Sequence, residues 1–280
     1  MSRPPLPDPY SGIPFAAVPL PAAVARIAAG QATEPVWENE EGGVTFHLPA
    51  SGQYVKFSPA GRIDLAVEAD RLRWAGRVLL GDHAGRHRGL AVPELVDNGS
   101  DADGSWLVTT AIPGRNAVTA HWRARPAVAA AAIGAGLRWW HDTAPVERCP
   151  YSWSAPDRLA DIRAHPERHD PRRWHPEHRH LTVEAAIRLL SDPPPVDRLV
   201  VCHGDACSPN TLLDDSGTAC ALVDLGSLGL ADRWADLAIA TWSLDWNYGP
   251  GFDRTLLDAY GIDPDPERTA YYRLLWDLGP

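Results

Sequence analysis

The densest group of reactive side chains lies between residues 199 and 226. An apolar run there leads into His203, Gly204 and Asp205, Asn210 follows five residues after the aspartate, and a second apolar run ends at Asp224. A carboxylate can accept the proton of an attacking hydroxyl, and carboxylate and carboxamide oxygens are the ligands that Mg²⁺ prefers. The pattern predicts phosphoryl transfer, with Asp205 as the base and with Asn210 and Asp224 as magnesium ligands.

These three side chains need a local framework that brings them together. A β-prone run over residues 211–213 is followed by the turn sequence Asp-Asp-Ser-Gly at 214–217 and by a second β-prone run over 219–223. Turn residues between two such runs predict a β-hairpin. The hairpin would carry Asp224 back beside the loop that holds Asp205 and Asn210.

A second candidate site residue is Lys56, the only lysine among 26 basic residues. A compact ammonium rather than a planar guanidinium at this one position favours a function for Lys56 over a chance occurrence. It lies on a predicted strand over residues 54–57, and Glu68 lies 12 residues later on a predicted amphipathic helix over 63–80. Taken by itself, Glu68 is interpreted as a surface glutamate on a charged helix.

The composition limits the classes of partner. The chain has 280 residues, a hydrophobic content of 45% and a net charge of −10, which disfavours nucleic acid as a partner and is compatible with a cationic small molecule. The proline-studded start lacks the apolar core of a signal peptide, and no apolar run is long enough to span a membrane. We expect a cytoplasmic monomer without membrane partners. The four cysteines lack the spacing of a zinc site or a disulfide framework.

Residues 203–210 (HGDACSPN) and 223–233 (VDLGSLGLADR) together resemble the aminoglycoside phosphotransferases, most closely their 3'- and 3''-branch. The resemblance implies an α+β, two-lobed protein-kinase-like fold with a small antiparallel-sheet N-lobe and a larger, mainly helical C-lobe. It divides the chain into an N-terminal extension (1–30), a nucleotide-binding N-lobe (31–109), a hinge (110–114) and a catalytic and substrate-binding C-lobe (115–280).

The same resemblance implies ATP and Mg²⁺ as cofactors. Lys56, paired with Glu68, would align the phosphates, and adenine would bond to the carbonyl of Thr110 and the amide of Ile112. Gly42 and Gly43 would cover the phosphates, but no Gly-x-Gly-x-x-Gly is present and a plain hairpin turn fits them equally well. Asp236 resembles the buried aspartate that anchors the catalytic loop in kinase-like folds.

The remaining elements follow from periodicity and from turn signals. We expect strands near residues 36–37, 44–48, 54–57, 90–96 and 106–110, a loop over 80–88, and helices over 22–29, 63–80, 126–141, 181–190, 232–242, 252–260 and 266–276. Residues 163–180 hold five of the 11 histidines and more arginine than acid. We interpret this segment as a solvated flexible loop, with a substrate cap and, less favoured, a metal-binding tract as the alternatives.

The acceptor is the least determined part of the prediction. The 3'-branch typically ends in an Asp-Glu-Phe-Phe-like tail and lines its drug site with carboxylates, whereas this chain ends in Trp276-Asp277-Leu278-Gly279-Pro280. The hinge over 110–114 also resembles that of the streptomycin 3''-kinases. Streptomycin, with two guanidinium groups and one secondary amine, is therefore the leading acceptor, and its 3''-hydroxyl the site. The candidate contacts with the drug, besides Asp205, are Asp277, Asp245 and Glu177.

Other functions stay open. A 3'-phosphotransferase of kanamycin or neomycin, or a kinase of choline, homoserine or a sugar, would use the same catalytic residues. A nucleotide-binding pseudokinase is disfavoured because the base, the metal ligands and Lys56 are all present. A protein kinase is also disfavoured, because no Ala-Pro-Glu signature follows Asp224.

Overall fold

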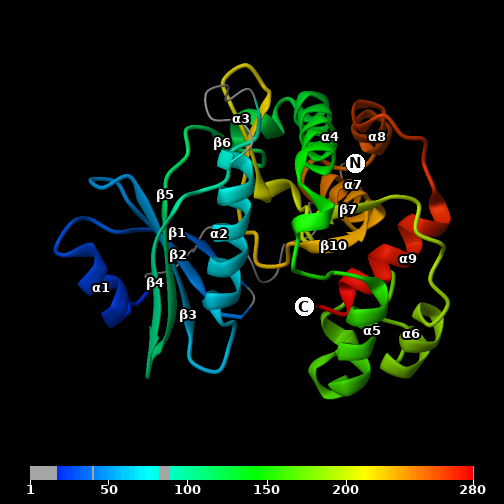
Figure 1. Ribbon diagram of the computed structural model, residues 1–280, viewed down its shortest axis with the longest axis horizontal. Helices are drawn as coiled ribbons and strands as arrows, with labels where there is room; N and C mark the ends of the chain where they lie inside the picture. The colour runs from blue at the N-terminus through cyan, green and yellow to red at the C-terminus, as the bar shows by residue number, and fades with distance from the viewer. Residues whose placement is uncertain (1–17, 40, 82–88, 280) are drawn as a thin grey trace, which may run out of the picture. The chain divides into compact units, whose positions relative to one another are not determined.

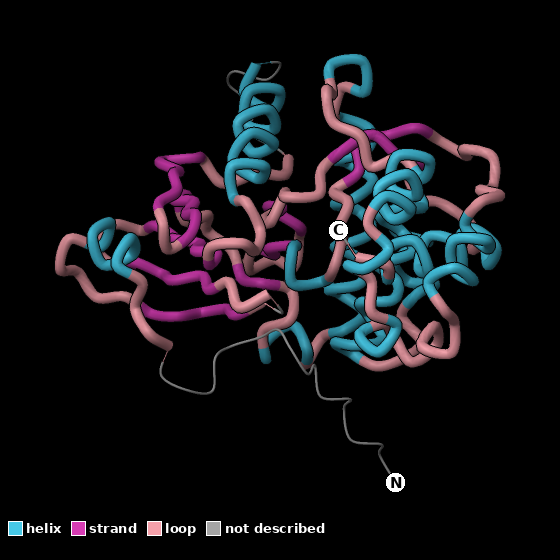
Figure 2. The backbone as a smooth tube through the Cα atoms, turned by 90° about the horizontal axis from the view of Figure 1, so that it is seen from below, coloured by secondary structure: helices cyan, strands magenta, loops and turns pink. Residues whose placement is uncertain are grey.

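The computed structural model describes residues 18–39, 41–81 and 89–279. The chain divides into two compact units, Met1–Arg86 with Ala91–Pro113, and His87–Leu90 with Gly114–Pro280. Figures 1 and 2 show that strands dominate the first unit and helices the second. Most of the loop expected over residues 80–88 lies outside the described residues, and residues 80 and 81 belong to the end of a helix.

The first unit is built around a five-stranded antiparallel sheet in the order β1-β2-β3-β5-β4. Its strands are β1 (Glu34–Glu38), β2 (Val44–Leu48), β3 (Gln53–Pro59), β4 (Leu95–Asp101) and β5 (Gly104–Thr110), and its helices are α1 (Ala22–Ala28) and α2 (Leu65–Gly81). The strands predicted near residues 36–37, 44–48 and 54–57 are confirmed, and they pair as an antiparallel meander.

The two faces of this sheet contact different helices because side chains alternate along a strand. On β5, Val108 packs with Val24 of α1, while its neighbour Leu107 packs with Leu65 of α2. On β3, Val55 and Phe57 join the α1 side. The intervening residue, Lys56, therefore points toward the face that α2 covers.

The strand expected over residues 90–96 is wrong in its position. Strand β4 begins at Leu95 and continues through Asp97-Asn98-Gly99 to Asp101. Pro93 has no amide hydrogen for a ladder, which works against an earlier start. The polar sequence is tolerated because β4 is the edge strand of the sheet.

The second unit contains two small sheets that hold the reactive segment. One pairs β7 (Leu199–Cys202) with β10 (Gly229–Asp232), and the other has the order β6-β8-β9, with β6 at Arg115–Asn116. Strands β8 (Thr211–Leu213) and β9 (Ala219–Leu222) pair antiparallel, with Thr211 opposite Leu222. The predicted hairpin is therefore confirmed.

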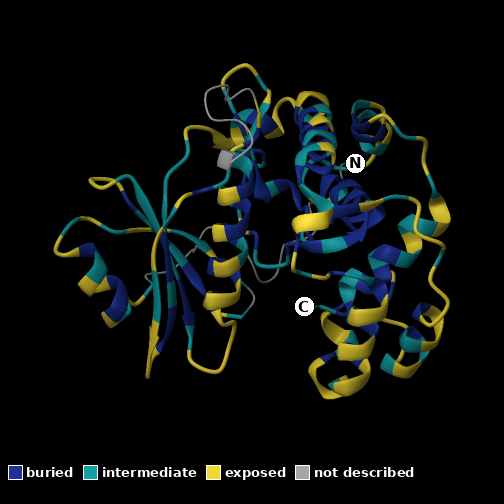
Figure 3. Ribbon diagram, viewed as in Figure 1, coloured by how far each residue is buried: buried dark blue, intermediate teal, exposed yellow. Residues whose placement is uncertain are grey.

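Helices supply most of the core of the second unit. Helix α7 is buried over all of its residues from Trp234 to Leu244, which Figure 3 shows in dark blue, and it packs against α9. Helices α4 and α8 approach closely at Gly134, where a Cβ atom would collide with the carbonyl oxygen of Leu256. The helices are α3 (Ala120–Arg123), α4 (Pro126–Thr143), α5 (Ala155–Ala164), α6 (Val183–Leu190), α7 (Trp234–Tyr248), α8 (Asp253–Tyr260) and α9 (Pro266–Asp277), with 3₁₀ turns η1 (Val146–Arg148), η2 (Pro166–Arg168), η3 (Pro171–Arg173) and η4 (Ser208–Asn210).

The segment over residues 163–180 is not the solvated loop that its composition predicts. It contains the turns η2 and η3, and Trp174, His169 and His178 are buried. Trp174 joins the large core cluster, which anchors the segment between α5 and α6. The expectation failed because one tryptophan and two histidines find buried partners that composition alone does not reveal.

The observed chain is thus α+β, with the strands concentrated in the first unit and the helices in the second. Within the described ranges, we find no helix that is both long and apolar enough to cross a membrane.

Candidate active site

The loop that follows β7 is held by one buried carboxylate. Asp236, in the first turn of α7, accepts hydrogen bonds from the backbone amides of His203 (2.7 Å) and Gly204 (2.8 Å). These amides directly precede Asp205. Asp236 thereby fixes the backbone from which the Asp205 side chain projects.

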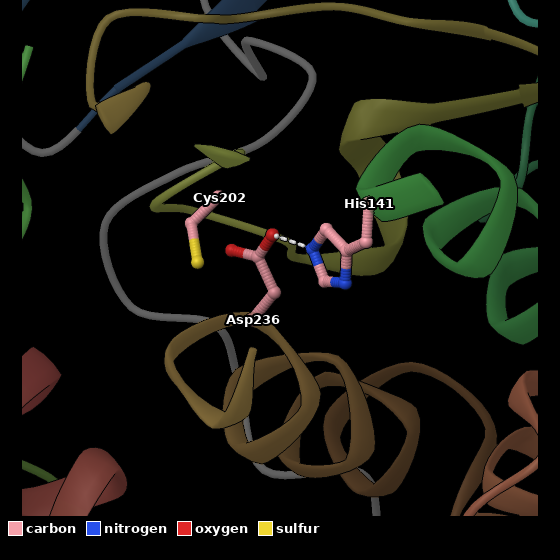
Figure 4. Close-up of side chains that lie close together, drawn as sticks. All are labelled: His141, Cys202 and Asp236. Atoms are coloured by element: carbon pink, nitrogen blue, oxygen red, sulfur yellow. Dashed lines mark hydrogen bonds and ion pairs between the residues drawn. The ribbon is translucent and has the colours of Figure 1, made fainter. Parts of the chain in front are cut away.

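Asp236 is itself part of a buried chain of hydrogen bonds, shown in part in Figure 4. Nε2 of His141, on α4, donates to Oδ2 of Asp236 (2.9 Å), and the hydroxyl of Tyr260 lies 2.9 Å from Nδ1 of the same imidazole. Burial alone would raise the pKa of the Asp236 carboxyl, but the hydrogen bond from His141 and the backbone amides hold that pKa below its ordinary value. The carboxylate is therefore kept as an acceptor for the catalytic loop.

The same place holds the one group of three metal-ligating side chains found within the described parts of the chain. One atom each of His141, Cys202 and Asp236 lie within 4.8 Å of one another (Figure 4). The oxygens of Asp236 already accept hydrogen bonds, and burial raises the pKa of the Cys202 thiol well above its ordinary value. The Asp236 oxygens and the Cys202 thiol already take part in hydrogen bonds, to the catalytic loop, to His141 and to the carbonyl of Asp232, so we interpret the group as a structural network.

The environment of Asp205 suits a base. Nδ2 of Asn210 donates to the Asp205 carbonyl (2.9 Å) and to Oδ2 of its side chain (3.1 Å). Oδ1 of Asp205 is buried and, among the described residues, has no hydrogen-bond partner. Burial, and then the charge of Asp224, raise the pKa of the Asp205 carboxyl above its ordinary value, against the opposing effect of a hydrogen bond from the Cys207 thiol. A carboxylate with a raised pKa and an unused oxygen can accept a proton.

The hairpin brings Asp224 next to this loop. The amide of Val223 donates to the carbonyl of Asn210 (3.0 Å), and Nε2 of His203 lies 2.9 Å from the carbonyl of Val223. The exposed Asp224 has a φ of 61°, in the left-handed region that few residues other than glycine adopt. Strained backbone of this kind is found where a side chain must point in one direction.

Glycine is required where the two loops meet. Gly204 has a φ of 81°, and a Cβ atom there would collide with the carbonyl oxygen of Ser227. The loop of Asp205 and the loop of Asp224 are therefore in direct backbone contact. Their spacing is fixed without any side chain between them.

The donor atoms at this point fit a hard divalent cation. Asn210 donates through Nδ2 to Asp205, so the Oδ1 of Asn210 points away from Asp205. Asp224 supplies a carboxylate, whose charge raises the pKa of the Asp205 carboxyl. Oxygen ligands alone, with two carboxylates repelling each other, match Mg²⁺ rather than zinc. Asn210 and Asp224 as magnesium ligands remain a prediction.

The predicted ion pair of the first unit is present. Nζ of Lys56 on β3 donates to Oε2 of Glu68 on α2 at 2.7 Å, and the two side chains are only 20% and 10% exposed. The sheet face on which Lys56 lies is the one that α2 covers, so strand alternation and helix phase together produce the contact. The role of the pair toward a nucleotide stays a prediction.

The other residues predicted to bind nucleotide are placed as follows. Thr110 ends β5, and its amide donates to the carbonyl of Glu94 (3.0 Å), while Ile112 lies in the segment just beyond. The amide of Gly43 donates to Oδ1 of Asn39 (2.7 Å), in the turn that also contains Gly42. This bond occupies the Gly43 amide that a phosphate would need, which favours the hairpin-turn alternative.

The three predicted drug contacts differ in their surroundings. Asp277, at the end of α9, is partly buried with a side chain that is 7% exposed, and its carboxylate accepts from the amide of His175 (2.9 and 3.0 Å) and contacts Nδ1 of His178 (2.7 Å). Glu177 is exposed, and Asp245 is partly buried on α7. Burial, and then the charge of Asp253, raise the pKa of Asp245. Asp277 thus fastens the segment over residues 163–180 to the last helix.

Two sets of residues were missed by sequence reasoning. His141 and Tyr260 complete the network behind Asp236, and tryptophans from α7 and α9 gather close to Cys207. The sequence does contain one signal, the spacing of four residues between Trp242 and Trp246, which places both on one face of a helix.

Comparisons with known proteins agree with this geometry. The profile of the phosphotransferase enzyme family matches residues 53–272. The chain is 33% identical over 263 residues to the aminoglycoside 3'-phosphotransferase of Streptomyces fradiae, which covers 85% of this chain and 91% of that protein. It is also 33% identical over 267 residues to the streptomycin 3''-kinase of Streptomyces griseus, covering 85% and 88%.

Solved structures give the same result. An aminoglycoside 3'-phosphotransferase of type VIII matches with a TM-score of 0.73 and 29% identity, over 89% of this chain and 94% of that one. The aminoglycoside phosphotransferase APH(3'')-Id of Streptomyces rimosus, whose structure has also been solved with ADP and streptomycin, matches with a TM-score of 0.67 and 27% identity, over 90% and 95%. The chain therefore belongs to the phosphotransferase enzyme family, and within that family to the aminoglycoside phosphotransferases.

Proposed function

We propose that this protein transfers the γ-phosphoryl group of ATP to a hydroxyl of an aminoglycoside, with the 3''-hydroxyl of streptomycin as the leading acceptor. The observation that carries the proposal is Asp205. Its Oδ1 is buried without a hydrogen-bond partner among the described residues, and its pKa is raised by burial and by the neighbouring Asp224. An acceptor hydroxyl would supply the missing hydrogen bond.

Asp205 orients this hydroxyl and accepts its proton as the new oxygen–phosphorus bond forms. In the same step the bond between the γ-phosphorus and the bridging oxygen of ATP breaks. Catalysis of this kind consists mainly of positioning and charge neutralisation, so the rigid backing of the loop by Asp236 contributes directly.

Asn210 and Asp224 are the residues that would hold Mg²⁺, which neutralises charge on the triphosphate when it is bound. Lys56, oriented by Glu68 at 2.7 Å, aligns the phosphates of ATP. Both assignments rest on donor chemistry and on the match to the family motifs.

The preference for streptomycin rests on the acids near the end of the chain. Drugs of the kanamycin type carry four or more amines and call for several free carboxylates. Here the Asp277 carboxylate is buried and engaged by His175 and His178, and the preceding position is Trp276 rather than an acid. An acceptor with fewer amines fits this site better. The identities to the 3'- and 3''-relatives are equal at 33%, so they do not favour either branch.

The test is turnover with streptomycin, kanamycin and neomycin, with the product mass recorded. Streptomycin should gain one phosphate. Asp205→Ala should abolish turnover while ATP still binds, and Asp215→Asn, at an exposed carboxylate of the nearby hairpin turn, should act as the wild type. Wild-type kcat in Asp205→Ala would refute the role of Asp205. Turnover of kanamycin or neomycin alone would keep the kinase and refute the preference for streptomycin.

A further inference from the structure

Four aromatic rings gather beside the loop of Asp205, and we refer to His175, Trp242, Trp246 and Trp276 as the aromatic cluster. The ring centroids of Trp242 and Trp246 are 5.1 Å apart, those of Trp246 and Trp276 are 5.8 Å apart, and those of His175 and Trp242 are 4.3 Å apart. The rings come from α7, from α9 and from the segment over residues 163–180. Part of the aromatic cluster is exposed, so its rings do more than pack in the core.

The cluster is continuous with the proposed base. Cys207 lies two residues after Asp205, and its thiol is close enough to the Asp205 carboxylate for each group to shift the pKa of the other. Cys207 packs in one cluster with Ile239 and Trp242, and Trp276 packs against that cluster. A molecule that offers a hydroxyl to Asp205 therefore has the aromatic rings within reach of its adjoining groups.

Exposure separates the buried floor of the cluster from its outer rings. Trp242 is 2% exposed, whereas Trp246 is 37% exposed, and Trp276 and His175 are partly exposed. Large exposed tryptophans on rigid helices are typical of binding surfaces, because they lose little conformational freedom on binding. The outer rings are supported from behind by Trp242.

The charges around the cluster favour a cation. Burial lowers the pKa of Arg273, whose guanidinium sits 5.3 Å from the centroid of Trp242, and the negative charges of Asp253, Asp245 and Glu177 oppose that shift. Burial lowers the pKa of His175, which leaves this ring neutral near pH 7. Three carboxylates against one guanidinium give the surface a net negative charge. Arg273 also shows that a guanidinium fits over a ring of this cluster.

We propose that the outer rings, Trp246 and Trp276, form the acceptor subsite that binds a planar guanidinium of the aminoglycoside through cation–π contact. The subsite rests on the proposed function, because it is the neighbouring part of the same acceptor site. In this subsite, cation–π contact with a flat aromatic surface in a negative electrostatic field takes the place of ion pairs to free carboxylates. Streptomycin carries guanidinium groups, whereas kanamycin carries only amines, so the subsite selects between them.

The experiment compares Trp246→Leu, Trp246→Phe and Trp139→Leu with the wild type. The leucine variant removes the π face but keeps an apolar side chain, and the phenylalanine variant keeps a π face. Trp139 is a partly exposed tryptophan of α4 outside the cluster, so its replacement controls for the loss of any tryptophan. The dissociation constants of streptomycin and kanamycin are measured by titration calorimetry, and thermal unfolding checks that each variant is folded.

We expect Trp246→Leu to weaken streptomycin binding about fivefold and kanamycin binding less than about twofold. Trp246→Phe should stay within about twofold of the wild type, and so should Trp139→Leu. Equal weakening by the leucine and phenylalanine variants, or an equal effect of Trp246→Leu on both drugs, would overturn the guanidinium subsite.

This test measures binding and not turnover, so its outcome can be distinguished from the outcome of the test of the proposed function. If the wild type binds streptomycin with the expected dependence on Trp246 but does not phosphorylate it, the proposed reaction fails and the subsite stands. If it phosphorylates kanamycin and does not bind streptomycin, the aminoglycoside kinase stands and the subsite is refuted.

Discussion

His141 offers the sharpest test of the network behind the catalytic loop. The substitution His141→Leu removes the imidazole that donates to Asp236 at 2.9 Å while keeping a side chain that fills part of the space. Both side chains of this pair are 0% exposed. The leucine leaves the Asp236 carboxylate in the core with only the two backbone amides as donors.

The expected loss is large because no solvent can replace the missing partner. Removing one member of a buried charged pair costs about 3–5 kcal/mol, and one hydrogen bond to a charged group contributes about 1.5–3 kcal/mol. The amides of His203 and Gly204 remain, so we expect the free energy of unfolding to fall by about 3 kcal/mol. The catalytic loop should also lose its fixed position, with a decrease in kcat.

Urea unfolding near pH 7 measures this loss. The pKa of Asp236 lies below its ordinary value in the folded state, so its contribution is fully present well above that value and is lost only as the pH falls through the folded pKa. His165→Leu, at an exposed imidazole 3.6 Å from Glu167, is the control and should change stability by less than about 0.5 kcal/mol.

Tyr260 gives a second check on the same reasoning. Tyr260→Phe should cost about 1 kcal/mol in the wild type, because its hydroxyl pairs with Nδ1 of His141, and almost nothing in His141→Leu. A loss below about 1 kcal/mol in His141→Leu, or additive effects of the two changes, would refute the network as a source of stability.

Three further predictions follow from the site. Lys56→Arg keeps the charge but not the compact ammonium, so kcat/KM for ATP should fall about 100-fold or more; a rate near the wild type in steady-state assays would show that charge alone suffices. Gly204→Ala should lower the free energy of unfolding by about 2 kcal/mol or more in urea, because its Cβ collides with Ser227 and its φ is positive; unchanged stability would contradict the close approach. Asp205 must be ionised to act as a base and its pKa is raised, so kcat/KM should fall with decreasing pH at a midpoint above 3.8; a midpoint at or below that value in the pH profile would argue against this role.

Local signals predicted the reactive segment well. The turn residues from Asp214 to Gly217 and the two β-prone runs beside them lie within one short stretch, so the hairpin and the placement of Asp224 follow from neighbouring residues. Lys56 and Glu68 are also close in sequence, and their pairing was predicted from the resemblance to the family, with a favourable helix phase as support. Such features depend on backbone preferences that a sequence states directly.

Contacts between distant segments were not predictable in the same way. The contact of His141 with Asp236 spans 95 residues, and that of His178 with Asp277 spans 99. In neither pair does the sequence around one residue contain a pattern that identifies the other residue. For the same reason the composition of residues 163–180 predicted a solvated loop, although Trp174 of this segment is anchored in the core.

The pairing of Lys56 with Glu68 also has a consequence for chemical labelling. Because the sequence contains a single lysine, an amine-specific acylating reagent has only one side-chain target, and that target lies in a 2.7 Å ion pair. Acylation needs the amine nitrogen to reach the reagent, which the contact with the Glu68 carboxylate hinders. The rate of labelling at this position therefore reports how often the strand and helix that carry the pair separate. The protein thus contains a native covalent probe of its first unit, without any engineered residue.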